Sequence, residues 1–170
     1  MKALLGLYDR IIEALAVLAG AAIAVAFVLI IIDVGIRVTG FRPPAFTIAT
    51  VEYLLLYFAL FAAPWLVRQK GHVYVDALVS RLPHGARKLL EKLVYALCVA
   101  APLIFAWFAM KLLIDAIASG MFEERAIDIP LWLLYAPMPL GFFLVATEFA
   151  RYLAGADTLY EDRTKVRDSV

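Results

Sequence analysis

Long stretches without a charged residue are the feature that most constrains how this 170-residue chain folds. Three of them, residues 14–32, 93–110 and 129–147, run for 19, 18 and 19 residues. A helix needs roughly 20 mainly apolar residues to cross a hydrocarbon core. A fourth stretch, residues 53–67, has only 15 residues, and it reaches spanning length when it is extended back to Phe46. We therefore predict an all-α integral membrane protein with four transmembrane helices.

Composition agrees with this prediction, because 65% of the residues are hydrophobic and only 18% are charged. A soluble domain is nearer to half apolar and a quarter charged. Backbone groups in lipid must be satisfied within the protein, so the spans are expected to be helices. We predict one domain over residues 1–155 and a polar cytoplasmic tail over residues 156–170. The four spans are expected at about residues 11–33, 46–67, 91–112 and 129–150.

Lysine and arginine residues predict the orientation, because cytoplasmic loops carry an excess of them. With four spans, both termini and the loop between the second and third spans lie on the same side. That side holds 12 of the 16 Lys and Arg residues, and the other side holds four. We therefore predict that both termini are cytoplasmic.

The loop between the second and third spans carries a helical pattern. Val75, Leu78, Val79 and Leu82 are spaced i, i+3, i+4, i+7, which places them on one helical face. A short amphipathic helix beside a membrane lies in the interface plane. This spacing predicts an interfacial helix at about residues 74–82, with a solvated loop as the alternative.

The last span has signals at its start and in its interior. Asp128 or Ile129 is expected to cap it, and Pro130 suits the first turn, where the N–H has no helical partner. Further on, Pro137 and Pro139 remove two backbone donors, which predicts a kink at that point.

Residues suited to catalysis or cofactor binding are scarce. The two histidines, His72 and His84, fall in the loop between the second and third spans, whereas haem ligation would need histidines within the helices. Cys98 is the single cysteine, and no phosphate-binding loop motif occurs. A net charge of +1 argues against a nucleic-acid partner. We expect no enzymatic activity, no cofactor and no metal site.

Ionisable residues near the span ends are the remaining candidates. Most have an opposite charge three or four positions away on the same helix, and we expect these pairs to form: Glu13 with Arg10, Asp33 with Arg37, Lys111 with Asp115, and Glu148 with Arg151. Glu52 has no basic residue within four positions, and Arg37 or Arg42 could reach it from outside its helix. A structural or partner-binding role is favoured for Glu52. The alternative is a self-contained small ion-coupled transporter or channel that uses this carboxylate.

Small residues share helical faces in two spans. Ala16, Gly20 and Ala24 lie on one face of the first span, and Ala96 and Ala100 on one face of the third. Such faces let helices approach closely, either within the protein or against a partner.

Several motifs in order resemble a known family. The run Lys70-Gly-His-Val-Tyr-Val-Asp76 follows the second span, and Glu52 lies early in that span. Asp128-Ile-Pro-Leu-Trp-Leu-Leu-Tyr135 opens the last span, and Asp33 and Arg37 close the first. Together these motifs resemble the small, Q-type membrane subunit of TRAP (tripartite ATP-independent periplasmic) transporters, over about residues 5–155.

The resemblance implies a non-catalytic permease subunit in the inner membrane of a bacterium. In that family the small subunit scaffolds a larger membrane subunit, which carries the sodium and substrate sites. A periplasmic binding protein delivers the substrate, an organic acid such as a carboxylate or sialic acid. The resemblance implies packing or partner contacts for Arg37, Glu52, Trp132 and Tyr135, and a role at the inner turn for His72 and Asp76.

Overall fold

The computed structural model describes residues 2–69, 84–123 and 128–153. Its elements are α1 (Lys2–Val38), α2 (Phe46–Arg68), α4 (His84–Ser119), β1 (Phe122–Glu123), β2 (Ile129–Pro130), α5 (Leu131–Tyr135) and α6 (Pro137–Leu153). Four helical segments are long and apolar enough to cross a membrane: Gly6–Val38, Phe46–Arg68, Lys92–Ser119 and Leu131–Leu153. The four-span, all-α prediction is therefore confirmed. The expected interfacial helix and cytoplasmic tail lie outside the described residues.

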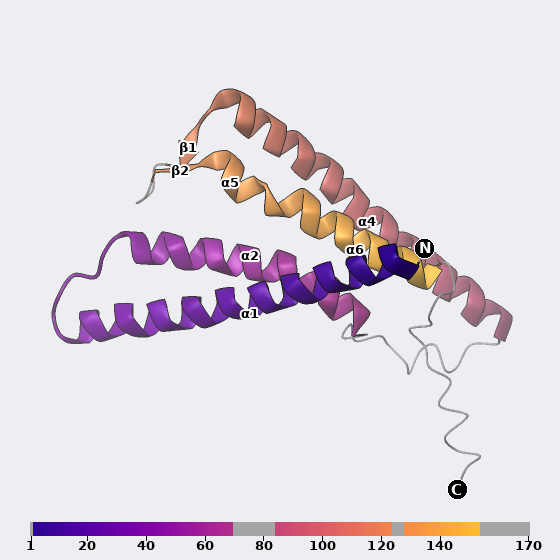
Figure 1. Cartoon of the computed structure of the whole chain (residues 1–170), viewed down its shortest axis with the longest axis horizontal. Coiled ribbons are helices and arrows are strands. Elements are labelled where there is room, and N and C mark those ends of the chain that lie inside the picture. The colour runs from indigo at the N-terminus through magenta and orange to yellow at the C-terminus, as the bar shows by residue number, and fades with distance from the viewer. Residues whose placement is uncertain (1, 70–83, 124–127, 154–170) are drawn as a thin grey trace, which may run out of the picture.

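The helices form two hairpins, α1 with α2 and α4 with α5 and α6 (Figure 1). The hairpins contact each other through α2 and α6. In Figure 1 they converge at the end that carries the N-terminus and diverge towards the connection between α1 and α2 and the β1–β2 ribbon. We call these the converging end and the diverging end. The charge distribution predicts that the converging end faces the cytoplasm.

Buried residues at intervals of seven hold each hairpin together. On α1 the most buried side chains include Ile12, Ala19 and Ala26, and on α4 they include Ala109 and Ala116. A seven-residue repeat keeps one seam of a helix facing its neighbour. Because most of these residues are alanines, the paired helices approach closely.

The small residues chosen from the sequence lie on other faces. Gly20, Ala24, Ala96 and Ala100 are exposed, and Ala16 is half-buried. A Cβ atom built on Gly20 would have no neighbour within 4 Å. These residues therefore do not form the seams within the chain.

The start of the last span differs from the prediction. Ile129 and Pro130 form β2, which pairs antiparallel with β1 and sets Phe122 opposite Pro130. The N-cap of α5 is Pro130, without a side-chain hydrogen bond, so the expected cap at Asp128 or Ile129 is wrong. Strand pairing engages Ile129, and the Leu131 N–H then donates to the Met121 carbonyl at 3.0 Å.

The prolines of the last span divide it into α5 and α6 at Ala136. Ala136 keeps helical angles (φ −54°, ψ −42°), and its N–H donates to the Trp132 carbonyl at 2.9 Å. One turn into α6, Gly141 faces Leu60 of α2 so closely that an added Cβ would lie 2.9 Å from the Leu60 carbonyl oxygen. Glycine at this position thus allows the two hairpins to touch.

Candidate functional site

Four charged residues from three helices meet at the converging end. Arg68 is the last residue of α2, Glu148 and Arg151 lie in the last turns of α6, and Asp9 lies near the start of α1. The charge-free stretches of the second and fourth spans end directly before Arg68 and Glu148. We call this set of four residues the clamp.

Arg68 is the central residue of the clamp. Its Nη2 atom lies 2.8 Å from Glu148 Oε1 and 3.0 Å from Asp9 Oδ1, and its Nε donates to Glu148 Oε2 at 3.4 Å. Arg151 Nη1 adds contacts of 3.3 Å to Glu148 Oε1 and 3.7 Å to Asp9 Oδ1. The bidentate contact between Arg68 and Glu148 fixes the orientation of the guanidinium group.

Burial makes the balance of charge in the clamp important. The Glu148 side chain is 3% exposed and that of Arg68 is 22% exposed, while Asp9 and Arg151 are about half exposed. A buried carboxylate is costly unless it is paired and hydrogen-bonded. Two arginines and two carboxylates give the clamp no formal net charge, so the clamp pairs its buried carboxylate within the chain.

Aromatic residues complete the junction. The Tyr8 hydroxyl is hydrogen-bonded to Thr147 Oγ1 at 2.8 Å, and its ring centroid lies 5.6 Å from the Arg68 guanidinium carbon, a cation–π distance. The Tyr152 hydroxyl donates to the carbonyls of Val67 and Arg68 at 3.0 and 3.2 Å. These carbonyls belong to the last turn of α2, where the carbonyl groups lack the usual helical donor four residues further on. Tyr152 therefore joins the end of α2 to α6.

The chemistry of the clamp is structural. Its charged groups bind each other, and the hydroxyl groups of the neighbouring Tyr8 and Tyr152 bind other helices of the same chain. Within the described residues, no group of three or more His, Cys, Asp or Glu side chains is placed to hold a metal ion. The arrangement fixes α1, α2 and α6 relative to one another at one end of the molecule.

The residues expected from the sequence to meet partners lie at the diverging end or outside the described residues. Arg37 Nε donates to Asp33 Oδ2 at 2.7 Å, as expected. Glu52 is exposed on α2. On α5, Trp132 is 43% exposed and Tyr135 is half-buried. His72 and Asp76 lie outside the described residues.

Sequence reasoning found only one contact of the clamp, the i, i+3 pair of Glu148 and Arg151. It missed Arg68 and Asp9, which come from other helices. One signal was available, since all four residues flank spans on the side predicted to be cytoplasmic. The expected pair of Lys111 with Asp115 is not formed, and Lys111 Nζ instead lies 5.5 Å from the centroid of the Trp107 ring.

The sequence was also compared with known proteins. No curated protein matches it. A family model described as "Tripartite ATP-independent periplasmic transporters, DctQ component" matches residues 26–157. The match covers more than three quarters of the chain and includes the second, third and fourth spans. The chain therefore belongs to the DctQ family, the small membrane subunits of TRAP transporters.

Proposed function

We propose that this small permease subunit is the fixed scaffold of a sodium-driven TRAP transporter. It holds the large membrane subunit in the bilayer while that subunit moves an organic acid, a carboxylate or sialic acid, delivered by a periplasmic binding protein. Both termini lie in the cytoplasm, and the converging end faces inward. The scaffold itself carries no transport site.

One observation carries this proposal: the charged residues of the four spans sit near their ends, where several neutralise each other. Residues 14–32, 53–67, 93–110 and 129–147 contain no Asp, Glu, Lys, Arg or His. Ion coupling in secondary transporters takes place near the midplane, at ionisable side chains or at broken helices. The broken segment here, at Ala136, retains its backbone hydrogen bond to Trp132. A rigid support fits these features better than a carrier.

A groove between α1 and α2 is the surface that best fits a helix of the large subunit. It has a volume of about 470 Å³, with Ala16, Ala19 and Gly20 among its α1 lining residues and Phe58 and Trp65 among those of α2. Small residues on one side let the backbone of a partner helix approach closely. Glu13, which is exposed, also lines this groove. We propose that a lysine or arginine of the large subunit lies opposite Glu13.

Co-purification tests the scaffold and the groove together. A tagged large subunit is expected to retain the wild-type chain in detergent. Gly20→Leu adds a side chain to the groove, and its Cβ atom would meet nothing within 4 Å inside the chain, so it should lower the amount of chain recovered several-fold. Ala100→Leu, a matched substitution at an exposed site on α4, should leave recovery unchanged. If the large subunit fails to retain the wild-type chain, the scaffold proposal is wrong, whereas equal recovery of both variants places the interface elsewhere.

The residues at the diverging end are proposed to serve the periplasmic side of the assembly. Trp132, Tyr135, Arg37 and Glu52 would contact the large subunit or the docked binding protein. The exposed Phe122 on the β1–β2 ribbon adds an apolar contact at the same end. His72 and Asp76 would belong to the turn on the cytoplasmic side.

A further inference from the structure

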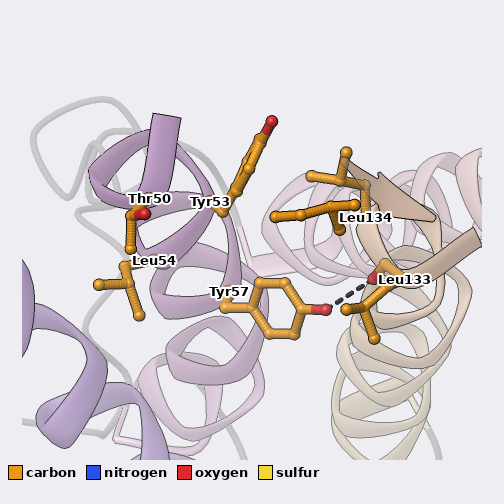
Figure 2. Close-up of a pocket in the computed structure, with 7 residues that line it drawn as sticks. Thr50, Tyr53, Leu54, Tyr57, Leu133 and Leu134 are labelled. Carbon is orange, nitrogen blue, oxygen red and sulfur yellow. Dashed lines mark hydrogen bonds between the residues drawn. The ribbon is translucent and has the colours of Figure 1, made fainter. Parts of the chain in front are cut away.

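A cavity separates the two hairpins at the diverging end. It lies between α2, which contributes Tyr53, Leu54 and Tyr57, and the segment of β2 and α5, which contributes Leu133 and Leu134 (Figure 2). Its volume is about 230 Å³. Apolar cavities of this size take up apolar groups rather than water. The α2 residues that line it are different from those of the groove between α1 and α2.

The polar groups around the cavity are satisfied, with one exception. The Tyr57 hydroxyl donates to the Leu133 carbonyl at 2.6 Å, and the Thr50 hydroxyl donates to the Phe46 carbonyl at 2.8 Å. The Tyr53 hydroxyl oxygen is enclosed and has no hydrogen-bond partner in the part of the chain that the structure describes. A buried hydroxyl without a partner is unfavourable, so an acceptor from outside the chain is expected there.

Membrane depth indicates what kind of acceptor meets Tyr53. The Tyr53 backbone lies seven residues into α2, about 10 Å along the axis from Phe46. Side chains on a helix point back towards its N-terminus, and in Figure 2 the Tyr53 hydroxyl points away from that of Tyr57. This direction brings the hydroxyl towards the outer boundary of the hydrocarbon, where tyrosines gather in membrane proteins. The neighbouring Glu52 is exposed, in agreement with that level.

We propose that the cavity binds one glycerophospholipid of the outer leaflet. One acyl chain fills the apolar space beside Leu54, Leu133 and Leu134, and an ester carbonyl at the top of that chain accepts a hydrogen bond from Tyr53. A lipid is the occupant that supplies an apolar chain and an acceptor at this depth. The lipid would hold the two hairpins apart at the diverging end, which is the end of the molecule opposite the clamp. This site does not depend on the groove proposed for the large subunit.

Photocrosslinking from within the cavity tests the occupant. The full-length chain with Leu54→p-benzoylphenylalanine is irradiated in membranes of cells that do or do not express the large subunit. Intact-mass analysis is expected to show an adduct with the mass of a phospholipid in both membranes. An adduct with the large subunit, or no adduct, overturns the proposal. The same probe at Phe143, which is 54% exposed on α6, reports contact with bulk lipid.

The hydrogen bond is tested by removing either partner. Tyr53→Phe should lower the lipid adduct at position 54 about fivefold, the usual effect of one hydrogen bond, and leave the adduct at position 143 unchanged. Tyr135→Phe, a matched change on α5 outside the cavity lining, should alter neither yield. In nanodiscs, dialkyl-ether lipids lack the ester carbonyl and should crosslink at position 54 less than diacyl lipids. Equal yields for Tyr53→Phe and wild type, or for ether and ester lipids, contradict the assigned acceptor.

Discussion

Replacing Arg68 with methionine is the sharpest test of the clamp. Methionine retains much of the apolar bulk but removes both hydrogen bonds to Glu148 and the 3.0 Å contact with Asp9. Glu148, 3% exposed, then keeps only the 3.3 Å contact with Arg151. Breaking a buried ion pair costs about 3–5 kcal/mol. Because Arg151 remains and Arg68 is 22% exposed, we expect a loss of about 2–3 kcal/mol in the free energy of unfolding.

The assay is unfolding of the purified chain in mixed micelles by increasing SDS, followed by far-ultraviolet circular dichroism at pH 7. The double variant Arg68→Met with Glu148→Leu also removes the buried carboxylate that Arg68 no longer pairs, so it should recover at least half of the lost free energy of unfolding. Arg42→Met is the matched control. Arg42 is exposed and takes part in no ion pair within the described residues, so its loss should leave the unfolding curve unchanged.

Two results would refute this reasoning. One is a loss for Arg68→Met no larger than that for Arg42→Met. The other is a double variant that is less stable than Arg68→Met by the full cost of a second independent substitution. Either result would mean that Glu148 is not held by Arg68 in the membrane-embedded protein.

Three further substitutions test other contacts. Gly141→Ala should destabilise the chain by about 1–3 kcal/mol in the same SDS titration, because its Cβ would lie 2.9 Å from the Leu60 carbonyl oxygen. Gly35→Ala is the control and should not destabilise the chain, because its Cβ would meet nothing within 4 Å. Tyr152→Phe should lower stability by about 1 kcal/mol, because two carbonyls of α2 lose its hydroxyl, and an unchanged curve would contradict that bond. Glu52→Gln should leave uptake by the assembled transporter within about twofold of wild type, because a scaffold does not couple uptake to protonation of that carboxylate. Abolished uptake would favour ion coupling through Glu52.

Local spacing predicted the features that depend on one helix. The charge-free stretches identified the spans because charges are excluded from hydrocarbon, and the i, i+4 spacing of Asp33 and Arg37 predicted their ion pair. Similar spacing failed for Lys111, whose ammonium group lies over Trp107. At an exposed site the free-energy difference between such partners is small.

Contacts between helices could not be predicted in this way. Arg68 and Glu148 are 80 residues apart, and only the packing of α2 on α6 brings them together. The seam of α1 follows residues 12, 19 and 26 rather than the small residues at 16, 20 and 24, because the face that meets α2 depends on helix rotation. Alanine is so common in this span that its positions do not identify that face.

Uptake by reconstituted transporter tests the scaffold account most directly. The chain, the large membrane subunit and the binding protein are assembled in proteoliposomes with an inward sodium gradient and a radiolabelled organic acid. We expect sodium-dependent uptake when both membrane subunits are present, and none with this chain and the binding protein alone. Uptake by liposomes that contain this chain as their only membrane protein would contradict the account, because a scaffold without a transport site cannot move substrate.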